Sequence, residues 1–137
     1  MTTNTYSLIA VIALAIIFSL LKEKMGKKGP NGAEYHTLDG ASLKEWIDDK
    51  EDFFLVDVRS EDEYKVGHIK TAKNIPLQNL KIVAESTFKN KDDFIVVYCL
   101  SGKRALSAAK TLIKMGYTEV YDFGSVNKYP DGTTKKK

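Results

Sequence analysis

The chain has 137 residues, of which 43% are hydrophobic and 28% are charged, and its formal net charge is +3 at pH 7. This length suits one domain with a terminal segment, and the composition excludes a chain that is disordered throughout. The charge is too small to indicate a nucleic-acid partner, because four lysines gather at residues 22–28 and three more end the chain.

An uncharged apolar run, LIAVIALAIIFSLL over residues 8–21, opens the chain and could enter a bilayer. With residues 5–7 it reaches 17 residues, the lower end of the length that spans a membrane. We therefore predict a single transmembrane helix as an anchor over residues 1–21; a buried core helix is the alternative, but no amphipathic period is visible. Because the neighbouring lysines follow the run, we expect a single-pass protein of the cell membrane, with its N-terminus outside and its domain in the cytoplasm.

Three further segments follow the predicted anchor. Residues 22–33 are rich in Lys and Gly and are predicted to form a linker. Residues 34–130 are predicted to form one domain, and residues 131–137 a disordered basic tail.

Within the domain, predicted helices and strands alternate. Asp39 is a predicted N-cap for a helix over 42–48, and apolar runs at 53–58 and 94–98 are typical of strands that are buried on both faces. We predict further helices over 60–66, 81–88 and 105–115, and further strands over 74–76 and 119–123. This alternation predicts an α/β fold with a small parallel sheet and helices on both faces.

Cys99, the single cysteine, lies where a predicted strand passes through a glycine-containing loop into a helix. Ligands of open parallel sheets bind at this edge, and the loop N–H groups and the helix dipole would favour a thiolate there. Lys103 and Arg104 add positive charge, and Gly102 permits a turn with positive φ. We predict Cys99 as the nucleophile, against the alternative of an inert buried cysteine. The predicted substrate-binding and persulfide-binding loop comprises Leu100, Ser101, Gly102, Lys103 and Arg104.

Two motifs resemble the rhodanese family. Residues 56–76, VDVRSEDEYKVGHIKTAKNIP, match its D-V-R, E-[FY], G-H-I and N-[IV]-P pattern, and residues 96–123 resemble its active loop and the flanking strand and helix. The resemblance implies a rhodanese-like fold and a sulfurtransferase that needs no cofactor. It also implies that Cys99 takes sulfur from a small anionic donor such as thiosulfate, becomes a persulfide, and passes the sulfur to cyanide or to a thiol, including that of a thioredoxin-like or other protein.

Other functions remain open at this point. The domain could carry sulfur for a partner protein with little turnover of its own, or serve as a non-catalytic regulatory module. A cysteine-dependent phosphatase is a further alternative, but those enzymes use Cys-x5-Arg, whereas Cys99 and Arg104 form the shorter Cys-x4-Arg. With one cysteine and two scattered histidines, the sequence has no metal-ligand spacing.

The first motif supplies four further candidates: Asp57, Arg59, Glu63 and His68. Asp57 could face the same edge as Cys99, or form an ion pair with Arg59. Arg59 and Glu63 are four residues apart, a spacing that permits an ion pair on one helix face. A histidine such as His68 could serve as a general base, but the resemblance implies that it packs and forms hydrogen bonds.

One segment departs from the family's pattern. Many relatives read G-G-x-x-x-W after the last strand, whereas this chain reads GSVNKY over residues 124–129. We expect this departure to affect the packing of the terminal segment and not the active loop.

Overall fold

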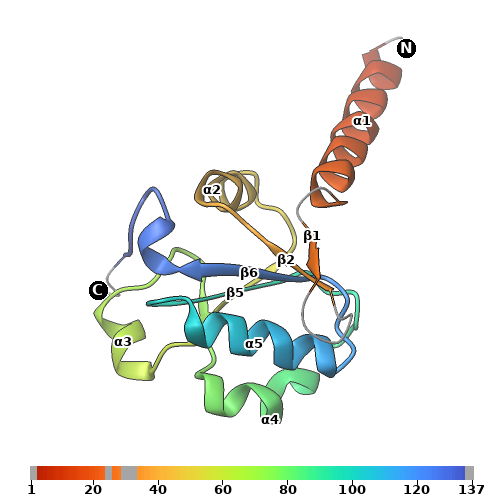
Figure 1. The fold of residues 1–137 in the computed structure, drawn as a ribbon. Coiled ribbons are helices and arrows are strands. Elements are labelled where there is room, and N and C mark those ends of the chain that lie inside the picture. Colours follow the sequence, from red (N-terminus) through yellow and green to blue (C-terminus); the bar gives the residue numbers. More distant parts are fainter. Residues whose placement is uncertain (1–2, 24–25, 29–33, 135–137) are drawn as a thin grey trace.

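The computed structural model describes residues 3–23, 26–28 and 34–134. In chain order the elements are α1 (Thr3–Glu23), β1 (Gly26–Lys28), β2 (Glu34–Thr37), α2 (Gly40–Asp48), β3 (Phe54–Asp57), α3 (Glu61–Val66), β4 (Lys73–Asn74), α4 (Leu77–Thr87), β5 (Ile95–Cys99), α5 (Lys103–Lys114), β6 (Val120–Ser125) and the short 3-10 helix η2 (Val126–Lys128). Figure 1 shows their arrangement.

The described strands form one six-stranded sheet in the order β1-β2-β6-β5-β3-β4. All neighbours from β2 to β4 pair in parallel, and β1 pairs antiparallel with β2. Strand β5 therefore lies inside the sheet, between β3 and β6. A parallel sheet places the carboxyl ends of its strands at one edge, so Cys99 ends β5 at the edge where such folds bind ligands.

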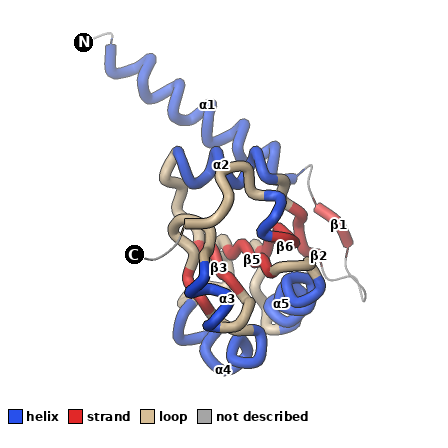
Figure 2. Tube along the Cα trace, turned by 90° about the vertical axis from the view of Figure 1, so that its left-hand side faces the viewer, coloured by secondary structure: helices blue, strands red, loops and turns tan. Residues whose placement is uncertain are grey.

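Helices cover both faces of the sheet, as predicted. Helices α4 and α5 lie on one face and α2 on the other (Figures 1 and 2). Alternate side chains of β5 point to opposite faces of the sheet. Val97 and Cys99 pack towards α4 and α5. Val96 and Tyr98 pack towards α2. Two apolar layers thus enclose β5, which explains why its sequence is a continuous apolar run.

Local sequence signals fix where the helices begin. The Asp39 side chain accepts a hydrogen bond from the Ser42 N–H at 2.7 Å, which confirms the predicted cap of α2. Ser60 caps α3 in a reciprocal arrangement with Glu63, so α3 begins one residue later than predicted. Helix α4 begins at Leu77, directly after Pro76, and not at residue 81.

Strands β1 and β2 and helix η2 are not among the predicted elements. The sequence of β1 is GKK, within the predicted linker, and β2 is the short segment EYHT. Neither has the apolar alternation of an independent strand, so pairing within the sheet defines them. The rest of the linker prediction falls largely on residues 24–25 and 29–33, which lie outside the described residues.

The segment predicted as a disordered tail is held against the domain as far as Thr134. Asp131 pairs with Lys44, whose Nζ lies 2.8 Å from the carboxylate. The backbone of Thr134 exchanges two hydrogen bonds with that of His68, at 3.2 and 2.8 Å. Residues 135–137 lie outside the described residues.

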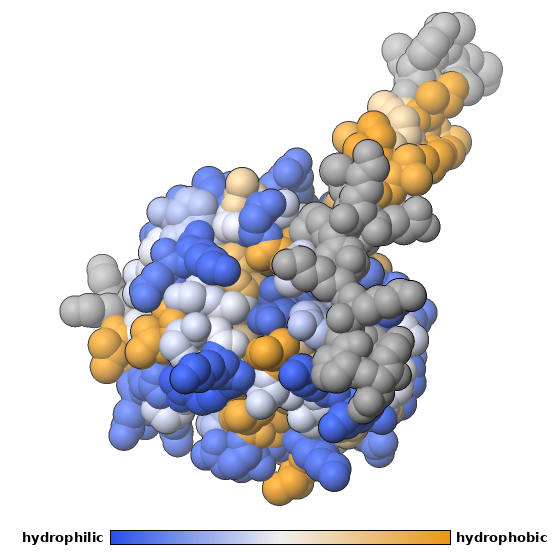
Figure 3. Space-filling view, viewed as in Figure 1, coloured by the Kyte–Doolittle hydropathy of each residue, from blue (hydrophilic) through white to orange (hydrophobic). Residues whose placement is uncertain are grey.

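Helix α1 projects from the domain (Figure 1), and apolar residues cover the part of it that is coloured in the space-filling view (Figure 3). Large apolar side chains along it, such as Leu8 and Leu14, are at least half exposed. Near its end, Phe18 packs edge-on against Trp46 with ring centroids 5.1 Å apart. No helix within the described residues is long and apolar enough to cross a membrane, so the predicted transmembrane anchor is not supported.

Gly40, the first residue of α2, lies against η2. A Cβ at this position would overlap the carbonyl oxygen of Lys128 and lie 3.1 Å from Cδ of Pro130. We predict that Gly40→Ala lowers the free energy of unfolding by about 1–3 kcal/mol, because the backbone there must shift. Urea denaturation would measure this, with the exposed neighbour Ala41→Ser as the control; equal stability of both variants would contradict the close contact.

Candidate active site

Cys99 is fully buried, and its sulfur is held by backbone N–H groups. Its Sγ accepts hydrogen bonds from the N–H of Gly102 at 3.0 Å and of Ala105 at 3.3 Å. The first donor lies in the loop and the second in the first turn of α5, where the helix leaves its N–H groups unpaired. Both donors and the positive end of the helix dipole therefore favour negative charge on this sulfur, as the sequence predicted.

Glycine at position 102 is a requirement of the loop geometry. Gly102 precedes α5 with a φ of 97°, in the left-handed region that residues with a Cβ rarely adopt. This conformation turns the chain so that the Gly102 N–H faces back towards Sγ. The Ala105 donor was missed from the sequence, although the expected start of a helix after the loop is the signal that could have indicated it.

The two cations of the loop are placed differently. Lys103 is exposed, whereas Arg104 donates to both carboxylate oxygens of Glu63, at 2.8 and 3.0 Å. Hydrogen bonds from Arg104 lower the pKa of Glu63 to about 2, and bonds from Ser60 add to this effect. Arg104 thus ties the start of α5 to α3, and Lys103 carries the exposed positive charge of the loop.

Asp57 and Arg59 form a buried ion pair beneath this edge of the sheet. Arg59 Nη2 lies 2.7 Å from the Asp57 carboxylate and also donates to the carbonyl of Gly67 at 2.7 Å. Burial alone would lower the pKa of Arg59, but the hydrogen bonds and charge of Asp57 outweigh it and raise that pKa. The alternative of an ion pair between Asp57 and Arg59 is thus confirmed, whereas the pair that the spacing permits between Arg59 and Glu63 does not form, because Glu63 pairs with Arg104. Arg59 precedes the N-cap Ser60, so it does not share a helix face with Glu63.

The remaining residues of the first motif hold the backbone around the ion pair. The ring of His68 stacks on Tyr64 with centroids 3.7 Å apart, and its Nδ1 lies 3.0 Å from the Tyr64 carbonyl. The Tyr98 hydroxyl accepts from the N–H of Ile69, and burial followed by the charge of Asp57 raises the pKa of Tyr98. His68 thus has the packing and hydrogen-bonding surroundings that the family resemblance implies.

A contact from β6 completes the site. The Ser125 hydroxyl donates to the carbonyl oxygen of Leu100 at 2.6 Å, and so reaches the residue that follows the cysteine. Leu100 itself is 47% exposed at the loop surface. The expectation that residues 124–129 leave the loop untouched is therefore wrong, because the sequence could not show which hydroxyl the end of β6 would bring to the loop.

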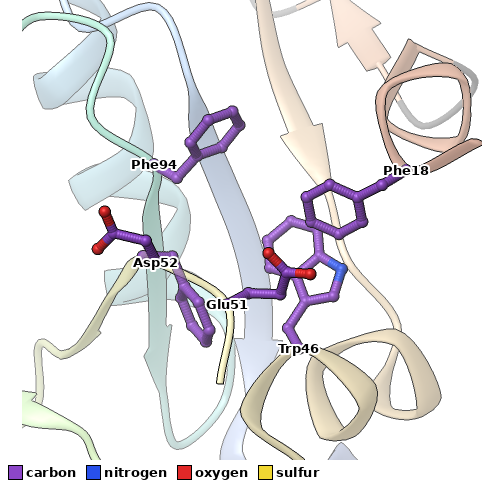
Figure 4. A pocket seen from close by; sticks show the side chains of 6 residues that line it. Phe18, Trp46, Glu51, Asp52 and Phe94 are labelled. Atoms are coloured by element: carbon purple, nitrogen blue, oxygen red, sulfur yellow. The ribbon is translucent and has the colours of Figure 1, made fainter. Parts of the chain in front are cut away.

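An open pocket of about 280 Å³ lies at the other edge of the sheet (Figure 4). Its walls come largely from the residues that precede β3 and β5, together with α1 and α2: Phe18, Trp46, Glu51, Asp52, Phe53 and Phe94. Because Phe94 precedes β5 and Cys99 ends it, this pocket is separated from the sulfur by the length of the strand. Among the described residues, no cluster of three or more His, Cys, Asp or Glu side chains is placed to hold a metal ion.

Comparison with known proteins agrees with this fold. The family model described as Rhodanese-like domain matches residues 39–129. Thiosulfate sulfurtransferase PspE of Escherichia coli is 35% identical over 71 residues, which cover 52% of this chain and 68% of that protein. Thiosulfate sulfurtransferase GlpE of Coxiella burnetii is 35% identical over 72 residues, which cover 53% of this chain and 65% of that protein.

A solved structure described as a rhodanese with anions from E. coli superposes with a TM-score of 0.57 at 31% identity. The superposition covers 61% of this chain and 98% of that one. The chain therefore belongs to the rhodanese-like domain family. Its homologues place it among the rhodanese-type sulfurtransferases, a class of enzymes.

The Glu63–Arg104 pair predicts a pH dependence of stability. Because the pKa of Glu63 lies near 2, below its ordinary 4.5, the stabilisation is complete above pH 4.5 and is lost as the pH falls towards 2. We expect Glu63→Gln to unfold more easily than the wild type at neutral pH, by about 1 kcal/mol or less because the pair is part-exposed. The difference should shrink below pH 4.5.

Urea denaturation at neutral pH and near pH 3 would measure this difference. Glu61→Gln is the matched control, because Glu61 lies on the same helix and forms a longer, exposed pair with Lys65 at 3.5 Å. A difference between Glu63→Gln and the wild type that is independent of pH would contradict the assignment.

Proposed function

We propose that the chain transfers a sulfane sulfur from thiosulfate, or a similar anionic donor, to cyanide or a thiol through a persulfide on Cys99. The observation that carries this proposal is the convergence of the Gly102 and Ala105 N–H groups on the Cys99 sulfur. The family membership supports the same activity, since the relatives are named thiosulfate sulfurtransferases.

In the first step the Cys99 thiolate attacks the outer sulfur of thiosulfate. A bond forms between the two sulfurs, the bond within the donor breaks, and sulfite leaves with the electron pair. The product is a persulfide anion on Cys99. Backbone N–H groups suit this step because they are fixed before the reaction and stabilise an anionic sulfur without reorganisation.

In the second step cyanide or an acceptor thiolate attacks the terminal sulfur of the persulfide. The new bond gives thiocyanate or an acceptor persulfide, and the electrons of the broken S–S bond return to Cys99 as a thiolate. No net oxidation occurs and no cofactor is needed. The covalent intermediate divides one transfer into two displacements, which is the advantage of a nucleophilic side chain.

The charge distribution assigns the attraction of the anionic donor to Lys103. Arg104 directs its guanidinium to Glu63, so their charges largely offset each other. Lys103 begins α5 and is exposed beside the loop. We infer that Lys103 contributes to donor binding, whereas Arg104 acts by holding α3 against α5.

Intact mass spectrometry after incubation with thiosulfate tests the proposal. We predict one added sulfur atom on the wild-type protein and none on Cys99→Ser. Cyanide should then remove the added sulfur and release thiocyanate, and steady-state kinetics should show a ping-pong pattern.

An unmodified wild-type protein after incubation with several sulfane donors would contradict this function. Loading without turnover to cyanide or small thiols would instead identify a sulfur carrier that serves a partner protein. Sequential kinetics with no detectable persulfide would exclude the covalent route.

A further inference from the structure

We propose that Ser125 is a positioning residue for the active loop, which it holds through the carbonyl of Leu100. The inference rests on the proposed function and deepens it, because it identifies what sets the direction of the loop N–H groups. It concerns a residue of β6 that lies 26 positions after Cys99 in the chain.

An irregularity in the sheet brings Ser125 beside the nucleophile. Val97 pairs with Asp122, but the next residue, Tyr98, pairs with Gly124, so β6 carries one extra residue at this point. The pairing then continues with Cys99 opposite Ser125. Such bulges re-aim side chains near active sites, and this one places a hydroxyl across from the cysteine.

Gly124 makes this geometry accessible. Its φ is 81°, in the left-handed region, which glycine adopts without strain. Ser125 follows in an extended conformation, with φ −93° and ψ 134°. The sequence Gly-Ser at the end of β6 therefore combines a turn in the backbone with a side chain that reaches the loop.

The hydroxyl of Ser125 forms hydrogen bonds with two neighbours, one as an acceptor and one as a donor. Its oxygen accepts from the N–H of Asn127 at 3.1 Å, which caps η2. Its single proton is donated to the carbonyl of Leu100 at 2.6 Å, a short hydrogen bond. Ser125 thus connects η2, β6 and the active loop through one side chain.

The contact constrains the loop because peptide units are planar. In a trans peptide the C=O of Leu100 and the N–H of Ser101 point in opposite directions. Holding the carbonyl on Ser125 therefore directs the Ser101 N–H away from Ser125, and the next N–H, of Gly102, already donates to Sγ. The Leu100–Ser101 peptide unit is therefore held by Ser125, directly before the Gly102 N–H that donates to Sγ.

This contact uses a side chain that the family pattern G-G-x-x-x-W does not contain. Position 125 corresponds to the second glycine of G-G-x-x-x-W, and glycine has no hydroxyl to donate. A chain with glycine there would have to hold its loop by other contacts. The departure from the pattern at position 125 therefore changes a contact of the active loop as well as the packing of the terminal segment.

Two rates measured on Ser125→Ala test the proposal: sulfur loading of Cys99 by thiosulfate, followed by intact mass, and alkylation of Cys99 by iodoacetamide. We expect both rates to fall about three- to tenfold, as for the loss of one hydrogen bond that orients the reacting group. Ser125→Thr keeps the hydroxyl and should restore both. Measurements are made well below the unfolding temperature of every variant.

Ser86→Ala is the matched control, because the Ser86 hydroxyl also donates to a backbone carbonyl, that of Val83 at 2.9 Å, at an exposed position of α4. It should leave both rates unchanged. If Ser125→Ala folds poorly, Ser125→Gly, which reproduces the family pattern, replaces it.

Unchanged rates in Ser125→Ala or Ser125→Gly would overturn the proposal, as would equal slowing in Ser86→Ala or no recovery in Ser125→Thr. Alkylation needs no sulfur transfer, so the two hypotheses can fail separately. A wild type that never accepts sulfur, with slow alkylation only in the variants without the hydroxyl, would refute the proposed function and retain the role of Ser125.

Discussion

The site depends on the buried sulfur of Cys99, which accepts hydrogen bonds from backbone N–H groups. An anionic sulfur at a position with no solvent exposure would be costly without compensation. The N–H groups of Gly102 and Ala105 supply that compensation. They can do so because β5 is an interior strand whose carboxyl end passes directly into α5. Three features therefore bring N–H groups to the sulfur of Cys99: the central position of β5, the turn at Gly102 and the start of α5.

The charged residues act mainly by fixing the segments around this arrangement. The buried pair of Asp57 and Arg59 joins the end of β3 to the carbonyl of Gly67. The pair of Glu63 and Arg104 joins α3 to the start of α5. Breaking the buried pair would leave a charge without a partner, whereas the part-exposed pair contributes less. In the proposed transfer, backbone dipoles and the exposed Lys103 attract the anionic donor.

Much of this fold was predictable because its signals are local. The apolar runs of β3 and β5, the cap at Asp39 and the loop after Cys99 are encoded in neighbouring residues. The pair of Asp57 with Arg59 was one of the predicted alternatives. The partner of Arg104 was not predictable, since Glu63 lies 41 residues from Arg104 in the chain. The contact of Ser125 with Leu100 depends on a bulge in sheet register, which no spacing in the sequence reveals.

The most direct test of the central claim is a crystal structure of the protein after treatment with thiosulfate. The account predicts a second sulfur bonded to Cys99 Sγ, with its terminal atom within hydrogen-bond distance of loop N–H groups, including that of Ser101. Leu100 should keep its contact with Ser125. A terminal sulfur that turns away from the loop amides, or added sulfur at any other residue, would contradict the claim that the backbone of this loop holds the transferred atom.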